Sequence, residues 1–404
     1  MAARPFPAPA FARLAQARLL RLARGFPVVV LTGPRQSGKT TLARSAFPGH
    51  AYVSLEELDT RAQANADPRG FIERWRGGVV IDEVQHVPQL LSYLQTEADA
   101  SRDMGRFILT GSQNLLLSGQ VSQSLAGRAA YVELLPLAYA EAQRHFAHFN
   151  LDSLLTTGFY PALHDRPIPA GEWHASYLAT YVERDVRQIS RVADLLQFQR
   201  FMRLMAARCG QLLNLNAVAH DLGVAQTTAR DWLAVLEASY IVFRLPPYHN
   251  NFGKRLVKTP KLYFHDVGLA AHLLGLTDAN AMNASPMRGA LFENLLISEY
   301  AKHCRNLGLT HGLYFWRDNI GNEIDFLIER GGTLWPLEFK SGATFQREWL
   351  NGLHTWARHA AAARRGEPML ISSAPGSQWI DDVMTAHWRD AVSTLDGKHE
   401  ESTA

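Results

Sequence analysis

The segment Pro27–Thr40, PVVVLTGPRQSGKT, indicates how the N-terminal part of the chain folds. Its opening run, PVVVLT, is β-branched and apolar, which is typical of a buried parallel strand. The residues that follow, Gly33–Thr40, fit the pattern G-x-x-x-x-G-K-[ST], and a helix is expected over Lys39–Ala46. A strand, a glycine-containing turn and a helix form the context that a phosphate-binding loop requires, so we predict such a loop rather than a chance match.

The residue types in this loop explain how it would hold a nucleotide. Gly33 and Gly38 let the backbone bend until its N–H groups point at phosphate oxygens, and the helix adds the positive end of its dipole. Lys39 is expected to bridge the β- and γ-phosphates of ATP, and Thr40 to give its hydroxyl to Mg²⁺. The residues expected to contact the nucleotide here are Gly33, Pro34, Arg35, Gln36, Ser37, Gly38, Lys39, Thr40 and Thr41.

Further strand patterns follow the loop. Ala51–Leu55, Gly78–Asp82 and Phe107–Thr110 each read as a strand, with helical stretches between them. Alternating strands and helices predict a parallel α/β sheet.

Polar residues follow two of these strands at their C-terminal ends, where ligands bind in open α/β sheets. Asp82 is expected to bind or support Mg²⁺, and Glu83 to polarise the attacking water; a solvated acid pair is the alternative. Ser112 and Gln113 follow the next strand and are candidates for sensing hydrolysis, with ordinary strand-end capping as the alternative.

Arg128, in the segment LAGR, is a candidate catalytic arginine that reaches the γ-phosphate in cis or from a neighbouring subunit. It is the one hint of a homo-oligomer in the sequence, and a plain surface arginine is the alternative.

The middle of the chain is helical from about Pro136 to Leu245. Leu215–Leu222 and Gln226–Ser239 flank a turn that contains Gly223, which is a helix-turn-helix pattern, and the strand expected after it resembles a wing. In DNA-binding versions the second helix enters the major groove. That helix would present Gln226, Thr227, Thr228 and Arg230, a thin positive set, so DNA and protein contact both remain open.

A hairpin in the last third carries acids and a lysine. Asn322–Glu329 alternates, with Glu323, Asp325 and Leu327 on one face and Ile324, Phe326 and Ile328 on the other. A two-residue turn at Gly331-Gly332 pairs Arg330 with Thr333 and sets Asp325 opposite Glu338 and Glu323 opposite Lys340.

Opposed carboxylates repel each other unless a cation lies between them, and a divalent metal that prefers oxygen meets that need. We therefore expect a second Mg²⁺ or Mn²⁺ at Asp325 and Glu338, with Glu293 as a further ligand. Lys340 would stabilise developing negative charge or help to activate water. The alternative is a half-exposed hairpin with cross-strand ion pairs.

Composition excludes several classes of protein. Hydrophobic residues make up 47% of the 404 residues, which is enough for large cores, and the net charge of +3 is too small to indicate nucleic-acid binding. Cys209 and Cys304 cannot build a disulfide framework, which favours a reducing, cytoplasmic location. No apolar run reaches the ~18 residues that span a bilayer, so no membrane partner is expected. We interpret Phe11–Arg24 as a basic amphipathic helix rather than a transit peptide.

Taken together, these segments resemble a known family. The chain is similar to prokaryotic AAA-type P-loop ATPases whose C-terminal region is a winged helix plus a restriction-endonuclease-like domain. The segments that carry the resemblance are GPRQSGKTTL, VVIDEVQHVP, LTGSQN, SLAGR, YVERDV, KTPKLYFHDVGLA, LFENLLISEY, YFWRDNIGNEIDFLI and PLEFKSG.

The resemblance implies that Lys39 and Thr40 lie at the nucleotide and that Asp82 and Glu83 serve Mg²⁺ and water. It also implies that Glu293, Asp325, Glu338 and Lys340 match the Asp…(Asp/Glu)-x-Lys nuclease signature, although Ile324 stands where the short form of that signature has proline.

The expected organisation is an ATPase domain at 1–135, a helical lid and winged helix at 136–250, a nuclease-like domain at 251–395 and a disordered tail at 396–404. The expected function is ATP hydrolysis that gates a metal-dependent nuclease acting on nucleic acid. The alternative is a regulatory ATPase switch whose nuclease-like domain is inactive and contacts proteins.

Overall fold

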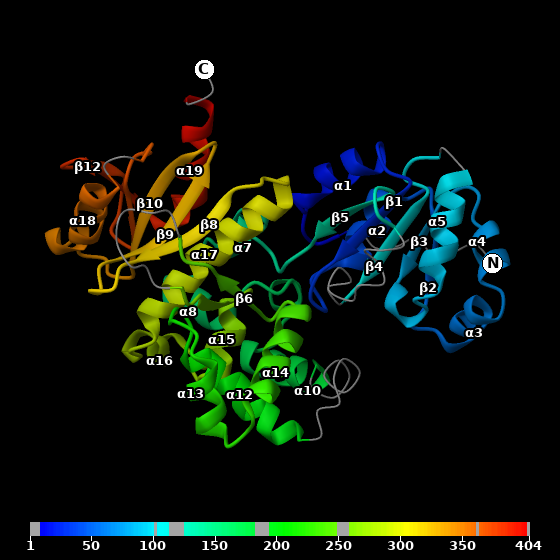
Figure 1. Ribbon diagram of the computed structural model, residues 1–404, viewed down its shortest axis with the longest axis horizontal. Helices are drawn as coiled ribbons and strands as arrows, with labels where there is room; N and C mark the ends of the chain where they lie inside the picture. Colours follow the sequence, from blue (N-terminus) through cyan, green and yellow to red (C-terminus); the bar gives the residue numbers. More distant parts are fainter. Residues whose placement is uncertain are drawn as a thin grey trace.

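The computed structural model describes residues 9–100, 103–112, 125–181, 194–248, 258–360 and 363–401. Within them, two sheets lie on opposite sides of the molecule, and a helical segment, green in Figure 1, lies below and between them. No helix in these ranges combines the length and apolar character needed to traverse a lipid bilayer.

The N-terminal sheet has five strands in the order β2-β3-β4-β1-β5. Every recorded pairing in it is parallel, which confirms the predicted α/β architecture. The fifth strand was not expected from the sequence. The strands are β1 (Val28–Thr32), β2 (Ala51–Ser54), β3 (Val79–Asp82), β4 (Phe107–Gly111) and β5 (Ala129–Glu133).

Helices cover both faces of this sheet because successive residues of its strands point to opposite sides. Val29 and Leu31 pack with α1 (Ala15–Ala23) and α2 (Lys39–Ala46). Val28 and Val30 belong to the cluster on the other face, which includes residues of α3 (Leu58–Ala66), α4 (Pro68–Glu73) and α5 (Leu90–Ala100).

The middle of the chain contains the predicted helix-turn-helix pair. Gly223, with φ +67°, ends the first of the two helices, α13, and the two-stranded antiparallel sheet β6–β7 follows the second, α14. The elements of this region are α7 (Gln143–Phe146), α8 (Leu151–Thr157), α9 (Ala162–Asp165), α10 (Ala170–Tyr181), α12 (Leu195–Ala207), α13 (Leu215–Leu222), α14 (Gln226–Ala238), β6 (Val242–Leu245), β7 (Lys261–Phe264), α15 (Val267–Leu273) and α16 (Ala279–Ala284).

The C-terminal sheet is mixed, with six strands in the order β12-β13-β11-β10-β9-β8. Helix α17 packs with one face of this sheet and α18 with the other. The elements are α17 (Arg288–Leu307), β8 (Gly312–Arg317), β9 (Glu323–Arg330), β10 (Thr333–Lys340), α18 (Asn351–His359), β11 (Met369–Ser372), β12 (Gln378–Ile380), β13 (Val383–His387) and α19 (Ala391–Glu401). Helix α19 thus extends into the segment that was expected to be a disordered tail.

The predicted hairpin turn is confirmed, because Arg330 pairs with Thr333. The predicted alternation along β9 is wrong in part. The register with β8 shifts between the pairs Tyr314–Leu327 and Trp316–Ile324. Beyond this bulge Ile324 packs on the α18 side, whereas Phe326 packs on the α17 side. A bulge adds a residue to one strand and re-aims the side chains beside it, here those next to Asp325.

One hydrophobic cluster runs from the helical middle into the C-terminal sheet. It holds Trp173, Phe198 and Trp232 together with Phe292 of α17 and Ile371 of β11. The cysteines Cys209 and Cys304 are buried in the same cluster, and neither forms a disulfide. The helical and C-terminal parts of the chain therefore share a core and do not pack as separate layers.

Candidate nucleotide site and carboxylate cluster

The loop between β1 and α2 has the backbone shape of a phosphate cradle. Gly33, Gln36 and Gly38 have φ values of +148°, +60° and +92°. A Cβ on Gly33 would lie 2.1 Å from the carbonyl oxygen of Leu134, so only glycine fits where the loop passes this strand end. The buried hydroxyl of Ser37 has no hydrogen-bond partner within the described part of the chain, as expected of a loop whose polar groups await a ligand.

Lys39 is 5% exposed and lies over this loop. Its Nζ donates hydrogen bonds to the carbonyl oxygens of Gly33 at 3.0 Å and Pro34 at 2.7 Å. A buried ammonium group above a loop of backbone N–H groups is the arrangement that binds the phosphates of a nucleotide.

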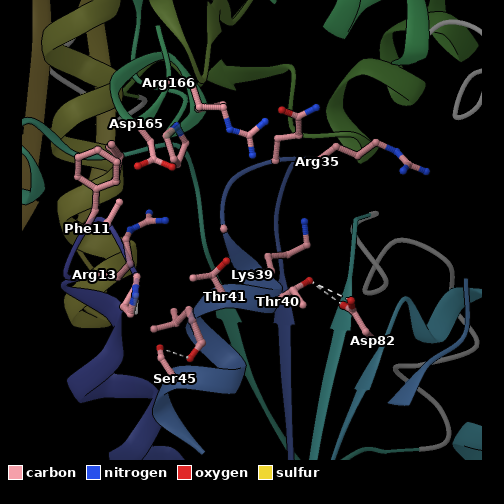
Figure 2. Close-up of a pocket in the computed structure, with 18 of the residues that line it drawn as sticks. Phe11, Arg13, Arg35, Lys39, Thr40, Thr41, Ser45, Asp82, Asp165 and Arg166 are labelled. Atoms are coloured by element: carbon pink, nitrogen blue, oxygen red, sulfur yellow. Dashed lines mark hydrogen bonds between the residues drawn. The ribbon is translucent and has the colours of Figure 1, made fainter. Parts of the chain in front are cut away.

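Thr40 and Asp82, far apart in sequence, meet at one end of the loop, as Figure 2 shows. The Thr40 hydroxyl donates to the two carboxylate oxygens of Asp82 at 3.1 and 3.0 Å. Tyr52 donates to the same carboxylate at 2.9 Å, and Thr110 donates to it as well. Burial, and then the charge of Asp82, raise the pKa of Tyr52. A hydroxyl beside a carboxylate supplies the oxygen ligands that Mg²⁺ prefers, so these residues fit the expected ion.

Glu83 follows β3 in a left-handed conformation, with φ +55°. Ser112, from the end of β4, donates its hydroxyl to Glu83 Oε2 at 3.2 Å, and Gln85 donates to the same oxygen. The structure thus brings Ser112 to Glu83, while Gln113 lies outside the described residues.

Arg128 lies away from these residues. It precedes β5, and Ala129 pairs with Val28 at the start of β1, whereas the loop begins at the other end of that strand. The Arg128 guanidinium pairs with Asp99 of α5, with Nη2 and Oδ2 2.9 Å apart. Arg128 therefore cannot reach the loop of its own chain, and its role as a catalytic arginine stays a prediction only for a neighbouring subunit.

A cavity of about 550 Å³ opens above the loop. Residues of the loop and both acids line it, together with the N-terminal residues Phe11 and Arg13 and with Asp165 and Arg166 at the end of α9. Arg166 extends toward the space above the loop, whereas Arg35 points away from Lys39 (Figure 2). The Nη1 atom of Arg35 lies 3.9 Å from Glu56 Oε1. The lining residues Phe11, Arg13, Asp165 and Arg166 were not predicted from the sequence, because they come from segments before the loop and well after the sheet.

The C-terminal acids gather around two lysines. Lys340 Nζ lies 2.9 Å from Glu338 Oε2 and 3.6 Å from Asp325 Oδ2, and Asp325 also accepts the backbone N–H of Phe339 at 2.9 Å. The structure thus brings Asp325, Glu338 and Lys340 together.

A second lysine, Lys261 of β7, was not expected from the sequence. Its Nζ lies 2.9 Å from Glu293 Oε1 and also pairs with Glu323. Glu323 in turn pairs with Arg317 at 3.0 Å. Within the described residues Glu323 does not form the expected cross-strand pair with Lys340; Lys340 pairs with Glu338 and Asp325 instead. The bulge in β9, which lies beside Glu323, is the physical reason.

Burial shifts the pKa of two carboxylates of this cluster, Glu293 and Glu338. Burial raises the pKa of Glu293 to about 7, although Lys261 opposes the shift. Burial and the neighbouring Asp325 raise the pKa of Glu338 well above its usual range, against the influence of Lys340. Burial alone would lower the pKa of Lys261, but Glu293 and Glu323 outweigh it, so the net shift is upward.

The expected second metal finds no ready set of ligands. Among the described residues, no three His, Cys, Asp or Glu side chains are grouped so that they could hold a metal ion. The cations that lie between the carboxylates are the ammonium groups of Lys261 and Lys340.

Comparison with known families identifies the nucleotide-binding part. Residues 25–143, which contain the loop, Asp82 and Glu83, match the family model described as an AAA domain. This part of the chain is therefore similar to AAA domains. Two further models, both described as domains of unknown function, match the chain at residues 148–280 (DUF8612) and 288–387 (DUF4143).

Relatives of the chain match most of its length. Uncharacterized proteins of Mycobacterium tuberculosis and Mycobacterium bovis are each 35% identical over 337 residues, covering 82% of this chain and 74% of theirs. The chain belongs to the same family as these proteins. An uncharacterized protein of Haemophilus influenzae is 25% identical over 310 residues, covering 68% of this chain and 75% of its own.

Among solved structures, a Walker-type ATPase of Pyrococcus abyssi has a TM-score of 0.42 and 15% identity, covering 64% of this chain and 94% of its own. DnaA of Aquifex aeolicus bound to AMPPCP has a TM-score of 0.28 and 14% identity, covering 55% of this chain and 86% of its own.

Proposed function

We propose that this protein binds ATP with Mg²⁺ and hydrolyses it. The observation that carries the proposal is the contact of Thr40 with Asp82 beside Glu83, at the edge of the sheet where the phosphate loop ends. Lys39 and the loop amides would hold the phosphates, and Thr40 and Asp82 the ion. Glu83 would orient and polarise the attacking water, held in place by Ser112.

The test compares ATP turnover by the wild type and Glu83→Gln at saturating nucleotide. Glutamine keeps the shape of glutamate and removes its basicity, so we expect turnover to fall about 10²-fold or more while ATP binding is retained. Lys39→Ala is the companion variant and should lose binding itself. A wild type no faster than Glu83→Gln would refute hydrolysis but leave binding intact.

We further propose that the nucleotide state controls the C-terminal domain and that this domain is a metal-dependent nuclease acting on nucleic acid. Asp325, Glu338 and Lys340 converge on one point, and the raised pKa of Glu338 indicates a carboxylate that lacks full cationic compensation. An added divalent ion would supply that compensation.

The nucleic acid would be contacted by the helical middle of the chain. The exposed side chains of Gln226, Thr227 and Arg230 on α14 are the candidate DNA contacts.

A second candidate, in which the C-terminal domain is catalytically inactive and serves for protein contact, is favoured by Lys261. Its ammonium group already lies between Glu293 and Glu323, where a further metal ligand was expected. A lysine in that place neutralises the carboxylates without a metal.

Metal binding and cleavage separate the two candidates. For the nuclease, we expect calorimetry to detect Mn²⁺ binding in the wild type that Asp325→Ala abolishes and Glu329→Ala, on the same strand outside the cluster, retains. Plasmid cleavage should depend on ATP and be lost in Lys340→Ala. A wild type that neither binds Mn²⁺ nor cuts DNA would favour the protein-contact module.

A further inference from the structure

The wall of the nucleotide cavity opposite Asp82 has the composition of a base-binding surface. Phe11 and Asp165 lie in this part of the cavity (Figure 2), and Pro161 and Ala162 begin the short helix that Asp165 ends. The lining residues Phe11, Leu137, Pro161 and Ala162 supply apolar atoms to the cavity, and Asp165 adds one carboxylate. Figure 2 shows Asp165 beside Phe11, across the loop from Thr40 and Asp82. A flat apolar surface with one polar group is how small-molecule pockets combine affinity with orientation.

The direction in which the phosphate chain would cross the loop determines which end of a nucleotide reaches this wall. Thr40 and Asp82 are the residues that would bind Mg²⁺, and that ion accompanies the β- and γ-phosphates. Thr41 lies on the other side of Lys39, toward Arg13 (Figure 2). The phosphate chain therefore runs from Asp82 toward Thr41, and the sugar and base continue toward Phe11 and Asp165.

Asp165 is available to a ligand. It is the last residue of α9 and is exposed, and its backbone N–H donates to the carbonyl oxygen of Pro161 at 3.0 Å. Its carboxylate makes no hydrogen bond or ion pair within the described ranges. By contrast, the other charged group at this end, Arg13, is held by Glu141 at 3.0 Å and by the carbonyl oxygen of Leu135 at 2.8 Å.

We propose that Asp165 selects the base by accepting a hydrogen bond from the exocyclic amino group of adenine, a role that rests on the proposed binding of ATP. At the same ring position hypoxanthine and guanine carry a carbonyl oxygen. A carboxylate facing that oxygen sets two acceptors against each other, with no proton between them. Asp165 thus favours an aminopurine over an oxopurine while the triphosphate contacts stay the same.

The test is direct binding of ATP, ITP and GTP to the full chain with Mg²⁺, measured by calorimetry. ATP and ITP share the sugar and phosphates, and we expect the wild type to bind ATP about tenfold more tightly. In Asp165→Asn the side-chain amide donates to the oxygen of hypoxanthine. We therefore expect ITP affinity to rise and the ATP-to-ITP ratio to fall to about one, a gain that damage to the fold cannot produce.

Glu56→Gln is the matched control. Glu56 is a second exposed carboxylate of the same cavity, but it lies on the loop side, 3.9 Å from Arg35. This variant should change ATP and ITP affinity by the same factor.

Equal binding of ATP and ITP by the wild type, or an unchanged ratio in Asp165→Asn, would overturn the assignment of Asp165 while leaving nucleotide binding intact. Tighter binding of GTP than of ATP would also overturn it, because Asp165 would then face the N–H donors of guanine. A chain that bound none of the three would overturn the proposed function as well.

Discussion

At the scale of single residues, the two arginines Arg128 and Arg166 and the adjacent acids Asp82 and Glu83 differ in their partners. Arg128 and Arg166 are both arginines near a phosphate-binding domain, yet one is paired with Asp99 at the far end of the sheet and the other lines the cavity. Asp82 and Glu83 are adjacent in sequence, yet one is held by Thr40 and Tyr52 and the other by Ser112. Such differences give neighbouring acids different chemical tasks.

The raised pKa of Glu293 predicts how the stability of the folded chain depends on pH. This pKa of about 7 in the folded chain lies above the ordinary value of 4.5, so the folded chain binds more protons than the unfolded chain between these pH values. The stability that depends on this group is therefore lost as pH rises from about 4.5 to about 7, by at most ~1.4 kcal/mol per pH unit. In metal-free buffer, Glu293→Gln should gain thermal stability relative to the wild type from pH 5 to pH 7.

The control is Glu348→Gln, which changes an exposed carboxylate of the same domain. Its difference from the wild type should not vary with pH. If Glu293→Gln showed the same flat difference, Glu293 would ionise in the folded chain as it does in water.

At the scale of elements, α17 joins the two parts of the molecule. Its Glu299 accepts the backbone N–H of Tyr139 at 2.7 Å, and its Lys302 donates to the carbonyl oxygen of Leu137 at 3.0 Å. One turn and a half earlier the same helix carries Glu293, which faces the carboxylate cluster. A displacement of the segment at Leu137–Tyr139 would therefore be passed to that cluster by a single rigid helix.

At the scale of the whole molecule, Arg13 connects the phosphate loop to this segment. Its guanidinium donates to the carbonyl oxygens of Ser37 at 2.5 Å and of Leu135 at 2.8 Å, and it pairs with Glu141 at 3.0 Å. Glu141 also accepts the N–H of Ala138 at 2.9 Å. Any shift of the loop on nucleotide binding would move the contacts that α17 makes with the same segment.

We expect ATP to change amide hydrogen exchange in α17 of the wild type, and Arg13→Met to abolish that change while ATP still binds. Arg106→Met is the matched control, because Arg106 is a similarly buried arginine that pairs with Glu97 at 3.1 Å within the N-terminal domain. Each variant removes a buried guanidinium and costs about 3 kcal/mol of stability. An α17 that responds to ATP equally in both variants would contradict a connection through Arg13.

The phosphate loop, the parallel sheet around it and the acids at the edge of that sheet could all be predicted from the sequence. These features depend on local rules: β-branched strands, glycines at bends, a lysine and a threonine at the start of a helix. The hairpin turn at Gly331-Gly332 was equally local, and its first pair, Arg330 with Thr333, is as predicted.

The surroundings of these motifs could not be predicted, because they depend on contacts between distant segments of the folded chain. Lys261 is far in sequence from Glu323, and Phe11 and Asp165 come from opposite sides of the AAA domain, so no spacing could place them together. The register of β9 with β8 shifts at a bulge next to Glu323, and Glu323 pairs with Lys261 and Arg317 rather than with Lys340 as expected. Contacts between distant segments depend on how whole layers pack, and packing is a property of the folded chain rather than of any window of its sequence.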